Sequence, residues 1–120
     1  MRFIRKNDVE WKKRGNVQQV KMLLEKIRTP ECKATFGLSK WPSGQGGKLH
    51  EHLNLDEVFY VTKGRGLVKI VNNVIELNEG DLVYISAGEK HAVIKSYPPY
   101  GIEMLFVLIP SCSETEIFEA

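Results

Sequence analysis

Two histidines and a glutamate in the middle of this chain have the types and spacing of metal ligands. His50 and His52 are two residues apart, and residues i and i+2 of an extended strand project to the same face. Glu57 shares its expected strand face with Phe59 and Val61, where a carboxylate is costly unless a cation compensates it. Strand spacing alone does not identify a third ligand, so ordinary surface histidines explain the pair equally well.

A further histidine, His91, follows a turn and begins another apolar run with Val93 on its own face. Imidazole and carboxylate donors together suit first-row divalent metals. Four protein ligands would leave up to two positions open in an octahedral shell, and open positions distinguish a catalytic metal site from a closed structural one. These residues therefore predict a metal centre with room for a small molecule.

The elements that must position these side chains are short strands. Turn residues recur at close intervals, and the runs between them are rich in Val, Ile, Phe and Tyr, which is typical of an all-β sandwich or barrel. Asn72-Asn73 predicts a tight hairpin. We expect strands over residues 34–39, 57–62, 67–71, 74–77, 82–85, 91–95 and 102–109.

The segment 17–28 is ambiguous between helix and strand. Val17, Val20, Leu24 and Ile27 have helical spacing among good helix formers, whereas the alternation of Val20, Met22 and Leu24 also fits a strand. Taken by itself, the segment slightly favours a helix.

The spacing of the candidate ligands resembles that of the cupin family. Residues 44–64 match the first cupin motif, G(X)5HXH(X)3-4E(X)6G, at each fixed position. Residues 80–95 resemble the second motif, G(X)5PXG(X)2H(X)3N, through Gly80, Gly88 and His91, while Ser86 replaces the proline and Lys95 replaces the asparagine. All three histidines of the chain fall on ligand positions.

The resemblance implies a fold and a site. The chain would form one domain over residues 1–120, a cupin double-stranded β-helix or jelly-roll barrel, in which residues 17–28 form a strand. Small cupins commonly form homodimers, so we expect one here. The resemblance also implies that one divalent transition metal per chain (Fe, Mn, Zn, Ni or Co) is bound inside the barrel by His50, His52, Glu57 and His91.

The substrate pocket is predicted less directly. Phe36, Phe59 and Phe106 are candidates for its wall, although each fits the barrel core as well. By alternation Lys95 shares the face of His91 and would meet an anionic substrate, although a solvated lysine at the strand end is the simpler interpretation. Tyr60 falls on the face opposite Glu57. No general base is evident beside the ligands unless Glu103 faces inward.

Fold does not determine the reaction. The cupin resemblance implies a metal-dependent enzyme, dioxygenase-like, acting on a small oxygen-bearing metabolite. The alternatives are a metal-dependent isomerase or decarboxylase, or a non-catalytic cupin that binds a small molecule. No catalytic residue beyond the metal ligands is assigned.

Composition excludes several other classes. With 17 basic and 15 acidic residues, the net charge of +2 gives no nucleic-acid footprint. No stretch approaches the roughly 20 apolar residues of a membrane helix. The basic start has no apolar stretch behind it, so we expect no signal peptide and a cytoplasmic protein.

Overall fold

The chain folds into two antiparallel sheets. The computed structural model describes residues 1–113, and residues 114–120 of the predicted domain lie outside this description. Within the described part, no helix has the length and apolar character needed to cross a membrane. The elements are the 3-10 helix η1 (Lys6–Asp8) and the strands β1 (Lys12–Arg14), β2 (Gln18–Leu24), β3 (Thr35–Trp41), β4 (Asp56–Gly64), β5 (Gly66–Ile70), β6 (Asn73–Leu77), β7 (Leu82–Ile85), β8 (His91–Ser96) and β9 (Ile102–Ile109).

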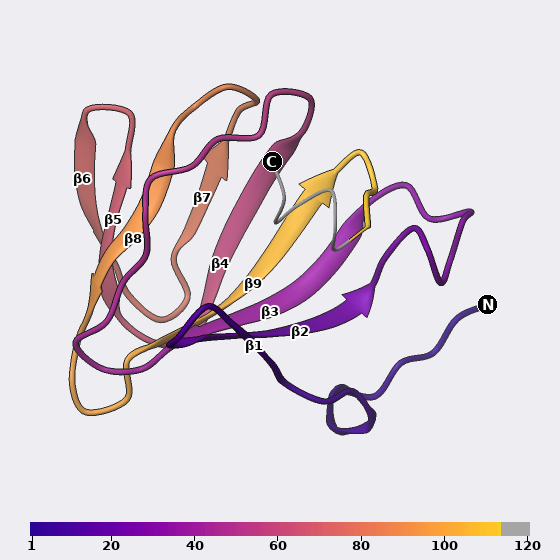
Figure 1. The fold of residues 1–120 in the computed structure, drawn as a ribbon, viewed down its shortest axis with the longest axis horizontal. Coiled ribbons are helices and arrows are strands. Elements are labelled where there is room, and N and C mark those ends of the chain that lie inside the picture. Colours follow the sequence, from indigo (N-terminus) through magenta and orange to yellow (C-terminus); the bar gives the residue numbers. More distant parts are fainter. Residues whose placement is uncertain (114–120) are drawn as a thin grey trace.

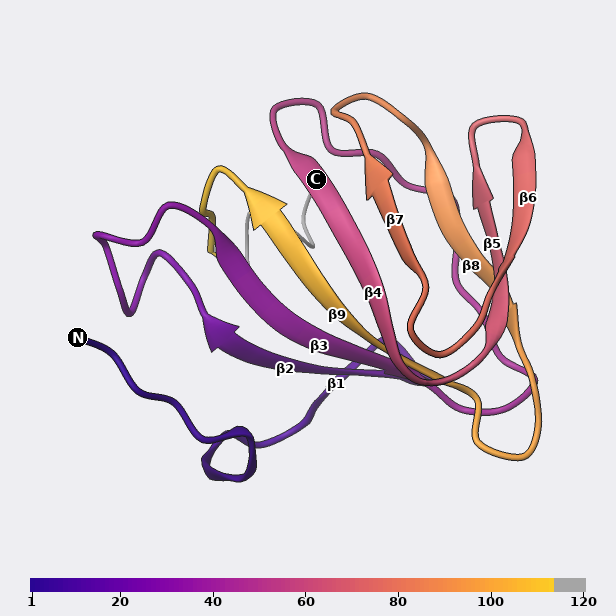
Figure 2. The same cartoon turned by 180° about the vertical axis from the view of Figure 1, so that it is seen from behind.

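The larger sheet has six strands in the order β1-β2-β3-β9-β4-β7, and the smaller has three in the order β6-β5-β8. Figures 1 and 2 show the two sheets splayed apart, with the long connection between β3 and β4 running past the smaller one. The predicted all-β jelly roll is therefore confirmed.

Residues 18–24 of the ambiguous segment form strand β2. Val20 pairs with Ser39 of β3 on one side and with Lys12 of β1 on the other. Val20 and Met22 are buried in the core. The helical spacing was outweighed because pairing on both sides satisfies the backbone while burying the alternating apolar side chains. The strand implied by the family resemblance was correct and the helix preference was wrong.

Alternation along β4 separates the interior from the exterior. Glu57, Phe59 and Val61 are buried between the sheets, while Val58 and Tyr60 point outward, toward the other side of the larger sheet. The buried core extends over both sheets and comprises Val20, Met22, Phe59, Val61, Val68, Ile70, Leu77, Ile85, Val93, Ile102, Met104, Phe106, Leu108 and Cys112.

The outer face of the larger sheet carries two apolar rows, which we call the outer rows. Cross-strand pairing aligns them over β3, β9, β4 and β7. Leu82 and Tyr84 at the edge are 61% and 52% exposed. The first row is Phe36, Val107, Val58 and Tyr84, and the second is Leu38, Leu105, Tyr60 and Leu82.

A β-bulge in β8 changes which side chains face inward. Val68 pairs with Val93 but Leu67 pairs with Lys95, so Ile94 is an extra residue. Beyond the bulge Ser96 is fully buried and Lys95 is exposed. The prediction that Lys95 shares the face of His91 was wrong, because the bulge breaks the alternation on which it relied.

The predicted hairpin is present between β5 and β6, but its turn comes one residue early. Ile70 pairs with Asn73, which leaves Val71 and Asn72 as the turn residues. Val71 adopts a φ of 55°, a conformation in which β-branched residues are uncommon.

Candidate metal centre

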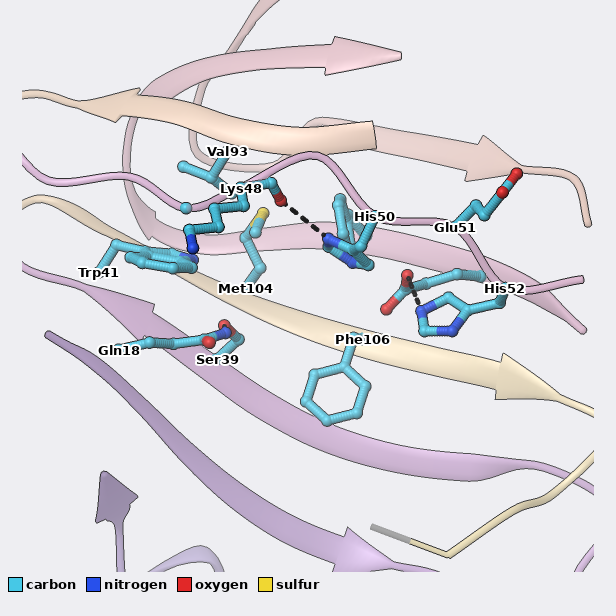
Figure 3. A pocket seen from close by; sticks show the side chains of 13 residues that line it. Gln18, Ser39, Trp41, Lys48, His50, Glu51, His52, Val93, Met104 and Phe106 are labelled. Carbon is cyan, nitrogen blue, oxygen red and sulfur yellow. Dashed lines mark hydrogen bonds and ion pairs between the residues drawn. The ribbon is translucent and has the colours of Figure 1, made fainter. Parts of the chain in front are cut away.

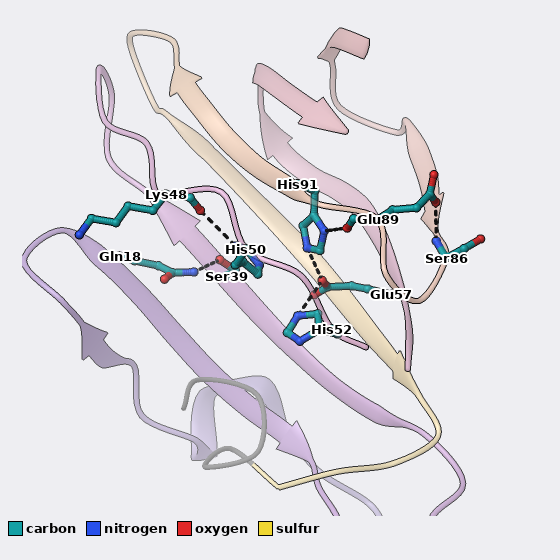
Figure 4. A network of polar contacts seen from close by, with 9 residues as sticks. All are labelled: Gln18, Ser39, Lys48, His50, His52, Glu57, Ser86, Glu89 and His91. Carbon is teal, nitrogen blue, oxygen red and sulfur yellow. Dashed lines mark hydrogen bonds and ion pairs between the residues drawn. The ribbon is translucent and has the colours of Figure 1, made fainter. Parts of the chain in front are cut away.

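His50, His52, Glu57 and His91 converge at one point between the two sheets. Each offers a ligand atom, and these atoms all lie within 4.8 Å of one another. Glu57 comes from β4 of the larger sheet and His91 from β8 of the smaller. Figure 4 shows the side chains of Glu57, His52 and His91 pointing toward one another. The four candidate ligands identified in the sequence are thus brought together, and Glu57 and His91 come from different sheets.

Backbone pairing places the two histidines that precede β4. His50 and His91 form an isolated bridge, with N–O distances of 3.0 and 2.9 Å. The carbonyl of His52 accepts a hydrogen bond from the backbone of Gly88 at 2.8 Å. The segment is therefore held extended against the smaller sheet without forming a regular strand.

Hydrogen bonds orient the imidazole rings. Nδ1 of His91 donates to the carbonyl of Glu89 at 2.9 Å, and Nε2 lies 2.9 Å from Oε1 of Glu57. Nδ1 of His50 lies 3.2 Å from the carbonyl of Lys48, which leaves Nε2 for a cation. Backbone carbonyls that fix the outer nitrogen are a usual feature of metal-ligating histidines.

Burial and hydrogen bonding shift the pKa values of Glu57, His91 and His50 in the cluster. Burial raises the pKa of Glu57, but hydrogen bonds from His52 and His91 outweigh this and lower it overall. Burial lowers the pKa of His91, but its bonds to Glu57 and the Glu89 carbonyl outweigh this and raise it overall. Burial, together with the neighbouring His91, lowers the pKa of His50.

The donor set fits a divalent transition metal. Both ring nitrogens of His91 face acceptors, so without metal the cluster favours a proton on Nε2 between His91 and Glu57. Nε2 of His52 lies 3.5 Å from the same carboxylate oxygen. A metal ion would replace that proton and be held by three imidazole nitrogens and one carboxylate oxygen.

The cluster occupies one end of a cavity of about 200 Å³. Figure 3 shows His50 and His52 at one end, Trp41, Gln18 and Ser39 at the other, and Met104 and Phe106 between them. We call the group Gln18, Ser39 and Trp41 the far end. The full lining comprises Gln18, Ser39, Trp41, Gly47, Lys48, His50, Glu51, His52, Glu57, Phe59, Val93, Met104 and Phe106.

The structure divides the residues predicted for the pocket wall. Phe59 and Phe106 line the cavity, whereas Phe36 and Lys95 do not. Phe36 belongs to the outer rows because Thr35, Gly37 and Ser39 take the inward positions of β3. Lys95 faces outward because of the bulge at Ile94.

Glu103 and two tyrosines that could act as acids, Tyr60 and Tyr84, also lie outside the cavity lining. Glu103 is buried on the far side of the larger sheet, where it accepts a hydrogen bond of 2.6 Å from Thr62. Tyr84 donates to Asp56 near the start of β4, which raises the pKa of Tyr84. Tyr60 is 40% exposed on the outer face, as its alternation with Glu57 predicts.

Sequence reasoning missed the far end. Gln18 fell in the segment whose conformation was ambiguous, and Ser39 and Trp41 lay on the face of β3 opposite the one assigned to the pocket. Had the face of Phe36 been assigned to the exterior, alternation would have identified Ser39 and Trp41.

A family comparison agrees with this arrangement of fold and ligands. The cupin domain model matches residues 37–98, which include all four candidate ligands. The chain belongs to the cupin family.

Two relatives and one solved structure are informative. An uncharacterised protein of Methanocaldococcus jannaschii is 33% identical over 73 residues, which span 52% of this chain and 58% of that protein. An oxalate-binding protein of Thermotoga maritima is 29% identical over 98 residues, 80% of each chain. The structure of KdgF from Halomonas sp. superposes with a TM-score of 0.83 at 18% identity, covering 96% of this chain and 98% of that one.

Proposed function

We propose that this cupin holds one divalent transition-metal ion on His50, His52, Glu57 and His91 and there binds a small metabolite through its carboxylate or keto oxygens. The observation that carries the proposal is the convergence of four ligand atoms within 4.8 Å at one end of a cavity. The similarity to an oxalate-binding protein supports a ligand with adjacent oxygen atoms.

The cavity is suited to an anion that arrives from solvent. Lys48 lines the cavity and is exposed, so its charge favours anionic ligands. Phe59 and Phe106 are nearly fully buried and limit the water that reaches the cluster. When bound, the metal would supply a Lewis acid for two ligand oxygens.

For turnover we propose a dioxygenase-type reaction as the second candidate. Such a reaction needs a redox-active metal and a mostly apolar pocket, and Phe59, Met104, Phe106 and Val93 provide apolar walls. Glu51 is the acidic side chain besides Glu57 on this lining. Isomerisation and decarboxylation of the bound acid are the competing reactions.

The test begins with elemental analysis of protein prepared without added metal or chelator, beside Glu57→Ala and the exposed control Glu79→Ala. We expect about one metal per chain in the wild type and control and none in Glu57→Ala. Calorimetric titration of loaded protein with oxalate should then show metal-dependent binding. The proposal would be refuted if wild-type protein retained no metal after loading, or if oxalate bound equally well with and without metal.

Turnover is tested separately. Protein loaded with Fe²⁺ or Mn²⁺ is incubated with a panel of small hydroxy and keto acids in an oxygen electrode. Oxygen uptake that requires both metal and substrate supports a dioxygenase. Carbon dioxide release or isomerised product without oxygen uptake would replace it with a decarboxylase or an isomerase, and unchanged ligand would leave a binding protein.

A further inference from the structure

We propose that the far end selects the substrate class: an acid whose carbon chain continues from the metal-binding oxygens to hydroxyl groups, as in a sugar acid, rather than a two-carbon diacid. This inference rests on the proposed function, because it assumes that the acidic end of the ligand binds at the cluster. Its basis is the separation, chemistry and rigidity of Gln18, Ser39 and Trp41.

The register of the larger sheet separates the two ends of the cavity. Glu57 lies in the inward row that contains Leu108 and Thr35, whereas Ser39 lies in the row of Met104. Thr35 and Ser39 are four residues apart on one strand, which is about 13 Å at the usual rise per residue. A diacid with a single carbon–carbon bond of about 1.5 Å cannot contact both ends.

The far end has the donors and acceptors of a hydroxyl-binding site. Nε2 of Gln18 donates to Oγ of Ser39 at 2.9 Å. This bond leaves the Gln18 carbonyl as an acceptor and the Ser39 hydroxyl proton as a donor. Ser39 is only 6% exposed although it lines the cavity. Neutral groups that both donate and accept hydrogen bonds match the hydroxyl groups of a ligand.

The middle of the cavity is apolar. Phe59 and Phe106 form the inward row between the row of Glu57 and the row of Ser39, and Met104 lies beside Ser39. Apart from the Met104 thioether, these three side chains present no hydrogen-bonding groups. A ligand therefore meets oxygen-binding groups at both ends and carbon in between. Trp41 adds a broad ring at the far end, against which C–H groups of a hydroxylated chain can pack.

The far end is held in place before any ligand arrives. The loop after Trp41 is tied to β8, because the backbone of Gly44 donates to Ser96 at 2.9 Å and that of Gly47 donates to Val93 at 2.8 Å. A Cβ on Gly47 would lie 2.6 Å from Cη2 of Trp41, so the ring packs directly on this loop. Such preorganisation lowers the entropy lost on binding.

The experiment compares ligands and variants by calorimetric titration of metal-loaded protein. The ligands are oxalate, hexanoate and three six-carbon sugar acids (D-gluconate, D-galactonate and D-mannonate). The variants are Ser39→Ala and Gln18→Leu, with the exposed Ser86→Ala as the matched control. Metal content is measured for each variant, so that a folding defect is recognised.

We expect at least one sugar acid to bind wild type and Ser86→Ala about tenfold tighter than hexanoate, as one or two hydrogen bonds allow. Ser39→Ala and Gln18→Leu should remove this preference while metal content and oxalate affinity stay within about twofold, because the ligand atoms of the cluster come from other residues.

Two results overturn the inference while the proposed function stands. In one, oxalate binds in a metal-dependent way but no sugar acid exceeds hexanoate. In the other, the variants with full metal content keep the sugar-acid preference. If neither oxalate nor any other acid binds in a metal-dependent way, the proposed function itself fails.

Discussion

The two faces of the larger sheet carry different chemistry on the same strands. On the inner face of β4, Glu57 and Phe59 contribute to the metal cluster and the cavity. On the outer face, Val58 and Tyr60 contribute to the uncharged outer rows. Glu57 and Val58 are adjacent in sequence, yet the first is a buried carboxylate whose charge calls for a cation and the second is an apolar side chain in an outer row.

The difference shows that a strand can serve two purposes independently. Because successive side chains point to opposite faces, a substitution on one face leaves the other in place. Variants of the inner face should therefore change metal or ligand binding, and variants of the outer face should not.

Removing one ligand of the metal cluster should have the largest effect. His91→Ala deletes one imidazole donor and the partner of Glu57. We expect metal affinity to fall by more than about 100-fold, since outer partners of metal ligands alone are worth about 10–100-fold. Competition with a fluorescent chelator measures this. Retention of wild-type affinity would mean that the metal is bound elsewhere.

In the metal-free protein, the contribution of the Glu57–His91 pair to stability should depend on pH. The lowered pKa of Glu57 adds stability that is present above its ordinary value of 4.5 and lost as pH falls through the lowered one. The raised pKa of His91 adds stability that is present below its ordinary value of 6.5 and lost as pH rises through the raised one.

The stability gap between wild type and Glu57→Gln should therefore depend on pH. We expect it to be widest between the ordinary values of 4.5 and 6.5, and to narrow on either side. Its maximum should be about 3 kcal/mol, as for other broken buried pairs. Urea unfolding of metal-free protein over a pH series measures it, and a gap that does not vary with pH would contradict the assignment of the pair.

Gly37→Ala should affect the cavity while sparing the cluster. A Cβ at this position would lie 2.7 Å from Cε1 of Phe106 and 3.0 Å from the backbone oxygen of Lys21. Because that backbone cannot yield, the Phe106 ring must move toward the cavity. We expect normal metal content and oxalate binding with about tenfold weaker binding of a six-carbon acid. If Gly37→Ala weakened the binding of oxalate and of the six-carbon acid equally, the two ends of the cavity would not act separately.

The outer face should give the smallest effect at the site. Apolar rows that are partly exposed at Phe36, Tyr60, Leu82 and Tyr84 suit a second copy of the same surface, because uncharged rows complement themselves. The homodimer expected from the cupin resemblance remains a prediction, and Leu82→Glu tests it through sedimentation. We expect a monomer with unchanged metal content, whereas loss of metal would show that the two faces are coupled.

The sequence predicted the cluster better than the rest of the site. Three of its ligands lie within eight positions, His50 to Glu57, and their spacing fixes their relation before any tertiary pairing is known. Phe36 and Lys95 were misplaced because the sheet face on which each lies depends on contacts between distant parts of the chain. For β3, the inward face is decided by which side packs toward the second sheet. For β8, it is decided by the extra residue Ile94 in its pairing with β5.

The origin of the ligands in both sheets has a consequence for the protein in a cell. A metal held by Glu57 and His91 would link two layers that are otherwise joined by packing and loops, and binding to the native state alone would stabilise it by mass action. Chains that lack the metal would then unfold more often and be degraded faster. The steady-state amount of this protein should then follow the supply of its metal, even where its synthesis is constant.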